Sequence, residues 1–431
     1  MTIDVRAAAA GVIGDVLGGK SLNQALPSRQ DRVEERDKAL LQELCYGTLR
    51  ESPKLQALLK QLMDKPLRSK DRDVQGLLLC GLYQLGTTRI PDHAAVAATV
   101  SATKALKKHW AKGLTNAVLR RYLREREQLV RQLDDASAAN HASWLYQKIQ
   151  TQWPAAAATI IEANNQRPPM TLRVNGQHQS AQAYLTDLQQ HGIAAHACNL
   201  SPYAIQLAQP QDVWTLPGFA AGQVSVQDEG AQMAGPLLHA SPGEQVLDAC
   251  AAPGGKTCHI LELQPGLAAL IAMDIDESRL QKVSDNLERL GMVATLLAGD
   301  AALPPKQLEQ TSFDRILVDA PCSASGVIRR HPDVKLLRRE TDIPQLAEQQ
   351  LGILQGLWPL LKVGGSLLYV TCSILDEENS QVVARFLDKQ SDATLSPIDA
   401  IWGEPAACGR QLLPSPSGPD GLFYSLLRKT G

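Results

Sequence analysis

The segment Gln245-Val-Leu-Asp-Ala-Cys-Ala-Ala-Pro-Gly-Gly-Lys-Thr257 decides the fold of the larger part of this 431-residue chain. A short apolar run ends in Asp248, and Gly254 and Gly255 interrupt the chain before an apolar stretch with helical spacing. A strand, a glycine-rich turn and a helix in this order are typical of the first unit of an open α/β sheet. In such sheets the acid and the turn lie where ligands bind.

Strands and helices alternate from residue 236 to the end of the chain. This pattern predicts a doubly wound, mainly parallel sheet over residues 236–431. The expected strands are 245–248, 269–274, 294–297, 313–319, 365–371 and 422–427, and the expected helices are 255–263, 278–290, 344–361 and 378–387.

Acidic residues follow four successive strands of this predicted sheet: Asp248, Asp274, Asp300 and Asp319. Because the carboxyl ends of parallel strands meet in one crevice, we expect these acids to surround a ligand. An acid after the second strand suits the hydroxyls of a ribose, and Asp300 suits an adenine amino group. A Walker A loop is excluded because Cys250 stands where its first glycine belongs, and no Gly-x-Gly-x-x-Gly motif for a nicotinamide cofactor is present.

Two cysteines follow the fourth and fifth strands, in Asp319-Ala-Pro-Cys322 and Thr371-Cys372. A buried cysteine is usually an inert small hydrophobic residue. Two cysteines at the ends of strands that are expected to be neighbours, beside a cofactor site, instead indicate reacting groups. The other cysteines are assigned to the inert class: Cys45, Cys80, Cys198, Cys258 and Cys408.

The N-terminal region, residues 1–140, is predicted to be an all-helical bundle. Residues 1–126 carry 22 Lys and Arg against 13 Asp and Glu, a local charge of +9 in a chain of net charge -2. A basic module of this kind binds phosphates without sequence preference, although a well-solvated helical surface explains the charge equally well. Residues 141–235 mix helices with short strand candidates near 170–175, 203–207 and 224–226, and are predicted to be a small connecting α+β subdomain.

The composition is that of a globular protein, with 44% hydrophobic and 20% charged residues. No apolar run approaches the ~18 residues that span a membrane, and no secretory leader precedes the first helix, so we expect a cytoplasmic protein without membrane contact. The eight cysteines are dispersed and lack Cys-x-x-Cys spacing, which argues against a disulfide framework and a metal site. A monomer is expected.

Three of these motifs also carry a family resemblance. The segments 248–257, 319–326 and 369–373 resemble the RNA cytosine-C5 methyltransferases of the Nol1/Nop2/Sun family. Weaker matches lie at 173–175 and at 420–423, where Leu422 replaces a phenylalanine common in the family. The segments 45–50 and 116–120 resemble a NusB-type RNA-binding domain. The combination is similar to bacterial family members that act on small-subunit (16S) ribosomal RNA.

The resemblance implies a Rossmann-like class I methyltransferase fold that uses S-adenosylmethionine. It implies that Cys372 is the nucleophile and that Cys322 helps to release the product, an allocation that sequence order alone leaves open. It assigns the cofactor to Cys250, Ala251, Ala252, Pro253, Gly254, Gly255, Lys256, Asp274, Asp300 and Asp319.

The chemistry of cytosine explains why a thiol is needed. Its C5 atom is too weak a nucleophile to take a methyl group unaided, and addition of a thiolate to C6 moves electron density onto C5. Loss of the C5 proton and expulsion of the thiol complete the reaction. An acid near N3 would hold the base and stabilise the adduct, a catalytic role that suits Asp319.

The three basic residues nearest the first cysteine, Arg329, Arg330 and His331, are candidates for gripping RNA phosphates, as are Lys335, Arg338 and Arg339 further along. A solvated helix surface is the alternative. The target cytosine has to leave its stack, so single-stranded or flipped RNA is the expected partner. Three other functions were weighed: a NusB-like RNA-binding factor without catalysis, a cytosine-C5 methyltransferase of another RNA such as tRNA, and an adenine amino-group methyltransferase. The last class expects Asn-Pro-Pro-Tyr or Asp-Pro-Pro-Tyr after the fourth strand, where this chain has Asp319-Ala-Pro-Cys322.

Overall fold

The computed structural model describes residues 3–431, and the chain divides into two compact units. The helical unit consists of Met1–Gln166 and Ile328–Glu340, and the sheet unit consists of Arg167–Val327 and Thr341–Gly431. The polypeptide therefore enters the helical unit twice, the second time from within the sheet unit.

The helical unit is built around α1, an alanine-rich helix that is buried on nearly all sides because its small side chains let neighbouring helices approach closely. Asp4 caps this helix by accepting from the backbone N–H groups of Arg6 and Ala7. The helices are α1 (Val5–Leu17), α2 (Leu22–Ala25), α3 (Pro27–Gln30), α4 (Lys38–Arg50), α5 (Ser52–Leu62), α6 (Arg72–Thr87), α7 (Asp92–Ala105), α8 (Ala111–Arg131), α9 (Asp135–Ala138), α10 (Ser143–Gln152), α11 (Ala157–Asn165) and α17 (Val334–Leu337).

The returning segment, residues 328–340, is part of the helical core. Leu336 and Leu337 pack against the main apolar cluster of this unit. The Asp333 carboxylate accepts from the backbone N–H of Leu22 at 2.9 Å, at the start of α2. Lys335 is buried and donates to the Arg50 carbonyl at 2.9 Å and to Asn165 Oδ1 at 2.6 Å. Apolar burial and hydrogen bonds thus both fix the segment to the N-terminal helices.

The sheet unit begins with a small antiparallel sheet of order β2-β3-β1-β4. Its strands are β1 (Thr171–Val174), β2 (Ala195–Ala197), β3 (Ala204–Leu207) and β4 (Val224–Val226), and α12 (Ala181–Gln190) packs on it through Tyr184 and Leu188. Arg173 of β1 forms a buried two-pronged ion pair with Glu262, at 2.7 and 2.6 Å, which ties the small sheet to the helix after the glycine-rich turn.

The large sheet has the order β11-β12-β13-β9-β8-β5-β6-β7, with β10 paired to β13. The strands from β9 to β7 are parallel, and the others are antiparallel. The strands are β5 (Gln245–Ala249), β6 (Ala269–Asp274), β7 (Thr295–Ala298), β8 (Phe313–Asp319), β9 (Leu361–Thr371), β10 (Ala393–Ser396), β11 (Glu404–Ala406), β12 (Gly409–Leu412) and β13 (Leu422–Lys429).

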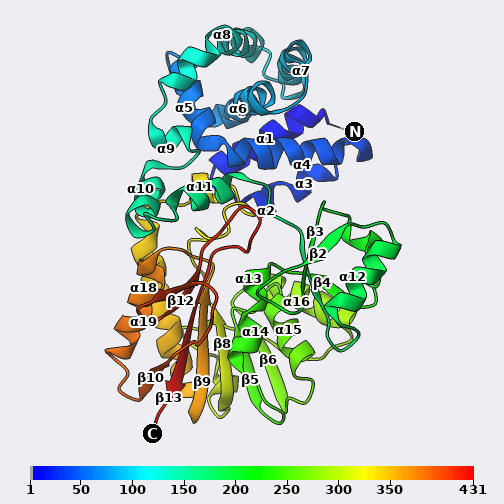
Figure 1. Ribbon diagram of the computed structural model, residues 1–431. Helices are drawn as coiled ribbons and strands as arrows, with labels where there is room; N and C mark the ends of the chain where they lie inside the picture. Colours follow the sequence, from blue (N-terminus) through cyan, green and yellow to red (C-terminus); the bar gives the residue numbers. More distant parts are fainter. Residues whose placement is uncertain (1–2) are drawn as a thin grey trace. The chain divides into compact units, whose positions relative to one another are not determined.

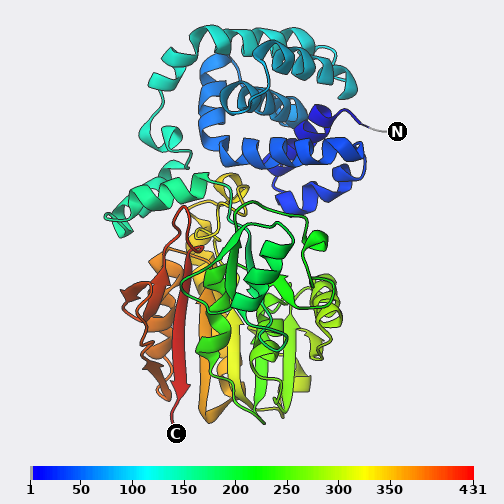
Figure 2. The same ribbon diagram turned by 45° about the vertical axis from the view of Figure 1, so that its right-hand side comes forward.

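Helices cover both faces of this sheet (Figures 1 and 2). Neighbouring residues of β5 point to opposite sides, so that Val246 and Leu247 belong to different apolar clusters. One face packs on α14 (Ala234–Leu238), α15 (Gly255–Leu263) and α16 (Glu277–Leu290), and the other on α18 (Asp342–Leu357) and α19 (Ser380–Leu387). The short helix α13 (Glu229–Gln232) precedes α14. The predicted combination of a helical NusB-like part, an α+β part and a Rossmann-like sheet is confirmed.

Some predicted bounds were wrong. The helix expected to reach residue 361 ends at Leu357, because Pro359 follows and Leu361 already begins β9. The helix α8 continues to Arg131, beyond the last apolar residues that predicted it, and an Arg121–Glu125 pair at 2.9 Å supports its solvated end. The short edge strands β10, β11 and β12 were not predicted, because they are only three or four residues long and one contains Pro405.

Candidate active site

The two cysteines singled out from the sequence face each other. Cys322 lies just beyond β8 and Cys372 directly follows β9, and these strands are parallel neighbours. The two Sγ atoms are 3.3 Å apart, and both side chains are partly exposed. The hydrogen bond with Cys372, followed by burial, raises the pKa of the Cys322 thiol well above its usual value. Cys322 is therefore a protonated thiol at neutral pH.

An ion pair lies at the end of β8. Lys256 Nζ is 2.6 Å from Asp319 Oδ2, and the Asp319 side chain keeps about a third of its surface, 32%, exposed. Burial opposes the ammonium charge, but the Asp319 carboxylate outweighs it and raises the pKa of Lys256 above its usual value. Lys256 thus holds a charged carboxylate at the open side of the strand ends.

Asp248 is a fully buried carboxyl near the Lys256–Asp319 pair. Thr257 donates to its Oδ2 at 2.6 Å, whereas its buried Oδ1 has no hydrogen-bond partner in the described chain. Burial raises the pKa of Asp248 to about 7. A buried acceptor without a donor is costly unless a ligand supplies one.

The loop from Cys250 to Lys256 adopts a conformation that brings its backbone toward the strand ends. Cys250 has a positive φ of 61° and Gly254 one of 98°. A Cβ on Gly254 would lie 3.0 Å from the backbone of Val283 in α16, so the turn requires glycine. The Ala252 N–H donates to Asp274 at 3.0 Å, which ties the loop to the end of β6.

These residues fit the expected cofactor, S-adenosylmethionine. Its ammonium group, ribose hydroxyls and adenine amino group all donate hydrogen bonds, and carboxylates stand after β5, β6, β7 and β8 to accept them. Asp274 is almost fully buried, Asp300 is exposed, and the Oδ1 atom of Asp248 is buried without a hydrogen-bond partner among the described residues. The residues that would hold the cofactor are the loop 250–256 and the acids Asp248, Asp274, Asp300 and Asp319.

The three basic residues proposed to grip RNA belong to the returning segment of the helical unit. Arg329 has no exposed surface, and its carbonyl accepts from Arg50 Nη2 at 3.1 Å. Arg330 and His331 are half-buried. In this conformation the Arg329 guanidinium offers no surface to a phosphate, and contact with RNA by the other two stays a prediction.

A buried polar network behind the cysteines was not predicted. Its central residue is Glu378, which the sequence placed at the start of a surface helix and the structure buries completely. The available signal was the acidic stretch 376–378 so soon after Cys372, but acids at a helix start usually serve as solvated caps.

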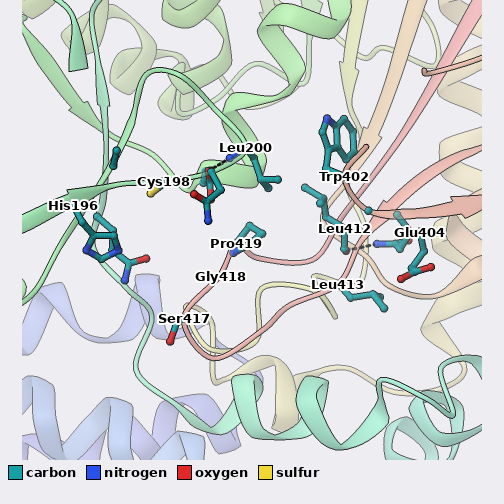
Figure 3. Close-up of a pocket in the computed structure, with 16 residues that line it drawn as sticks. His196, Cys198, Leu200, Trp402, Glu404, Leu412, Leu413, Ser417, Gly418 and Pro419 are labelled. Atoms are coloured by element: carbon teal, nitrogen blue, oxygen red, sulfur yellow. Dashed lines mark hydrogen bonds between the residues drawn. The ribbon is translucent and has the colours of Figure 1, made fainter. Parts of the chain in front are cut away.

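A separate pocket of about 390 Å³ lies in the sheet unit (Figure 3). His196 and Cys198 line it from β2 and the turn after it, Trp402 and Glu404 from the β11 region, and the loop from Leu413 to Pro419 closes it. The same loop continues to Gly421, whose N–H donates to the Gly326 carbonyl at 2.9 Å, while the Gly326 N–H donates to the Cys372 carbonyl at 2.9 Å. The pocket wall is thus joined to the reacting loops by backbone hydrogen bonds.

Two other kinds of site were sought along residues 3–431. No helix there is long and apolar enough to cross a membrane. Nor do three or more His, Cys, Asp or Glu side chains gather there in a way that could hold a metal ion.

Comparisons with known proteins agree with this arrangement. Residues 236–428 match the family described as 16S rRNA methyltransferase RsmB/F, residues 141–214 its ferredoxin-like domain, and residues 4–124 the NusB family. The ribosomal RNA small subunit methyltransferase B of Pseudomonas syringae pv. tomato is 50% identical, over 98% of this chain and 96% of its own length. That of Proteus mirabilis is 49% identical over 99% of both chains. A solved methyltransferase homologue from Pyrococcus horikoshii is 29% identical with a TM-score of 0.57, and covers 67% of this chain and 99% of its own.

Proposed function

Because the chain belongs to the RsmB/F family of 16S rRNA methyltransferases, we propose that it methylates C5 of a cytosine in small-subunit ribosomal RNA. The observation that carries the proposal is the 3.3 Å approach of Cys322 and Cys372 at the ends of neighbouring parallel strands. Two thiols are needed when one sulfur forms a covalent bond to the base and another group helps to break it.

In the proposed reaction Cys372 adds through its thiolate to C6 of the cytosine, which makes C5 nucleophilic. S-adenosylmethionine, when bound, supplies an electrophilic methyl group. C5 takes that group, a general base then removes the C5 proton, and the electron pair of the C5–H bond forms the C5–C6 double bond. The C6–sulfur bond breaks in the same step and releases Cys372 as a thiolate. Asp319 binds the N3 side of the ring in this proposal, and its ion pair with Lys256 supports that role by fixing the carboxylate.

The coupling between the thiols suits Cys322 to the second half of this reaction. The hydrogen bond from Cys372, more than burial, raises the pKa of Cys322. Once Cys372 is bonded to C6 it is a thioether without charge or thiol proton, so this contribution disappears. The pKa of Cys322 then falls back toward its ordinary value, and burial still holds it above that value. Cys322 can therefore give up its proton more readily after the adduct has formed than before.

The helical unit is proposed to hold the RNA through its basic charge, as its match to the NusB family suggests. The cytosine enters the sheet unit in a flipped or single-stranded state, since neither sulfur can reach a base inside a duplex. The protein is proposed to act in the cytoplasm as a monomer.

The test compares two alanine variants on a denaturing gel with labelled RNA and S-adenosylmethionine. Cys322→Ala is expected to attack and methylate, then to accumulate a protein–RNA adduct that survives denaturation. Cys372→Ala is expected to form no adduct and no product. Adduct from Cys372→Ala alone would reverse the two roles, and the absence of adduct from both variants would contradict the covalent mechanism. Melting curves of both variants exclude unfolding as the cause.

A further inference from the structure

Each of the two cysteines is followed by a serine, and one buried carboxylate binds both serines. Glu378 lies at the end of the short 3-10 helix η6 (Asp376–Glu378) and has no exposed surface. Its Oε1 accepts from the backbone N–H of Ser323 at 2.7 Å. Its Oε2 accepts from the Ser373 hydroxyl at 2.6 Å. The carboxylate therefore links the residue after Cys322 to the residue after Cys372.

The residues before the two cysteines are held by Gln350, which hydrogen-bonds to the Glu378 carboxylate, and by Asn379, which follows Glu378 in the chain. Gln350 of α18 donates to Glu378 Oε1 at 3.1 Å and to the carbonyl of Pro321 at 2.9 Å. The next residue, Asn379, accepts from the Thr371 hydroxyl at 2.6 Å and donates to the Ser373 carbonyl at 3.0 Å. Both cysteine loops are thus fixed on each side of the sulfur-bearing residue.

The donors around this position favour a carboxylate. Three donors converge on it, from Ser323, Gln350 and Ser373, and an ionised carboxylate has acceptor sites for all of them and no donor of its own. Hydrogen bonds to an ionised acceptor are short and strong, which suits a group that must keep two loops in register. A glutamine can accept from Ser323 and Gln350 through its oxygen, but its N–H group would face the Ser373 hydroxyl. That hydroxyl would then have to accept instead of donate, and the short charge-assisted hydrogen bond would be lost.

We propose that Glu378 is a positioning residue that sets the distance between the Cys322 and Cys372 sulfur atoms by binding the residue that follows each of them. The inference rests on the proposed function only for its catalytic consequence, namely that two sulfurs act in turn on one cytosine ring. Its geometric content concerns two thiols 3.3 Å apart and can be measured without RNA or methyl donor.

The experiment measures how fast the two thiols can be joined. The oxidant diamide takes up two electrons and two protons as the thiols form a disulfide, and peptide mass spectrometry identifies the Cys322–Cys372 bond. Formation requires the sulfurs to approach bonding distance with a favourable dihedral angle. The full-length wild-type protein is compared with Glu378→Gln and with Glu348→Gln, a matched control. Glu348 lies on α18 in an exposed pair with Arg385.

The wild type and Glu348→Gln are expected to form the bond at the same rate. Glu378→Gln is expected to form it on the order of 10- to 100-fold more slowly, because displacements of about 1 Å between reacting groups have effects of this size. A single-turnover methylation assay should show a comparable loss with KM for RNA unchanged. Equal cross-linking rates in Glu378→Gln and the wild type would overturn the proposal.

A second variant covers the case in which Glu378→Gln does not fold. Ser373→Ala removes only the hydroxyl that donates to Oε2 and leaves the Ser323 hydrogen bond in place. The proposal is supported if Ser373→Ala forms the Cys322–Cys372 bond more slowly than the wild type does. A rate equal to that of the wild type contradicts it. Cys322→Ala, which cannot form this bond, gives the background signal. Slow cross-linking in Glu378→Gln together with no adduct from Cys322→Ala would reject the proposed function and retain this inference.

Discussion

Two clusters of buried ionisable groups each contain a lysine, and the pKa values of the two lysines are shifted in opposite directions. The carboxylate cluster of the sheet unit contains Asp248, Lys256 and Asp319, and the Asp319 charge raises the pKa of Lys256 against the effect of burial. The Lys335 cluster of the helical unit contains Lys335 and His141. Burial lowers the pKa of Lys335 well below its usual value and that of His141 to about 3, and nearby positive charges act in the same direction.

The difference distinguishes a candidate binding site, the carboxylate cluster, from a group that only stabilises the fold, the Lys335 cluster. Lys335 donates to two uncharged acceptors, a backbone carbonyl and an amide oxygen, both within the helical unit. The carboxylate cluster keeps an exposed edge at Asp319 and an unpartnered oxygen on Asp248. Strong pKa shifts occur in both clusters, so a shift alone does not identify a ligand site, whereas an unsatisfied acceptor next to an open edge does.

Replacing Asp248 by asparagine is expected to give the largest change in the free energy of unfolding, and it tests the carboxylate cluster. The folded-state pKa of about 7 lies above the ordinary value of 3.8, so the folded protein binds more protons than the unfolded chain between these pH values. Stability therefore falls as pH rises through this window. Asp248→Asn should be more stable than the wild type at pH 8, by at most about 4 kcal/mol, and no more stable at pH 4. Melting curves against pH test this, and a constant difference would show that Asp248 does not titrate there.

The next largest effect is expected from Lys335→Ala. The substitution leaves the Arg50 carbonyl and Asn165 Oδ1 without their donor and opens a space in the helical core. We expect a loss of about 3 kcal/mol in the free energy of unfolding. Affinity for S-adenosylmethionine should not change. Denaturant titration and calorimetry measure the two quantities, and a loss of cofactor affinity would contradict the separation of the clusters.

Lys256→Ala, in contrast to Lys335→Ala, should lower activity and leave stability nearly unchanged. Without the ammonium group Asp319 loses its 2.6 Å partner and its fixed orientation. We expect methylation to slow on the order of 100-fold, while the melting temperature changes little because the pair lies at an open edge. Single-turnover kinetics beside a melting curve provide the test. Restoration by Lys256→Arg would indicate that the positive charge is what matters.

Asp274→Ala is expected to have the smallest effect. We propose that its carboxylate binds the ribose hydroxyls, and it also accepts from the Ala252 N–H, so the change is expected to remove ligand contacts and to loosen the loop. We expect cofactor affinity to fall about tenfold, the value of one or two hydrogen bonds to a charged acceptor. Isothermal titration measures it, with Glu348→Gln as a neutral control. Unchanged affinity would remove Asp274 from the cofactor site.

The sequence predicted the parts of the molecule that depend on local patterns. The apolar strands at Asp248, Asp274 and Asp319 are regular enough to predict a doubly wound, mainly parallel sheet. The expectation that the fourth and fifth strands are neighbours is confirmed, and these strands bring the two cysteines together. The position of Arg329 could not be predicted in this way. Its closeness to Cys322 in the sequence suggested the active site, but the chain returns to the helical unit there, driven by Leu336 and Leu337.

Glu378 was missed for a related reason. A glutamate at the start of a predicted helix is normally solvated, and nothing in the local pattern shows that three donors from separate segments converge on it. Long-range hydrogen bonds of this kind leave no periodic signal. Residues that act by holding others are consequently harder to find than residues that react.

Because the chain returns to the helical unit at residues 328–340, this unit is completed late during synthesis. Residues 1–166 leave the ribosome well before this segment, because the 161 residues 167–327 are made in between. At about 5–20 residues per second, the wait is roughly 10–30 s. During that time the surface that receives Leu336 and Leu337 is uncovered, and the Arg50 carbonyl has no lysine to bind. The N-terminal helices are thus made first but acquire their finished core late, and a nascent chain arrested near residue 166 should expose an apolar surface to chaperones.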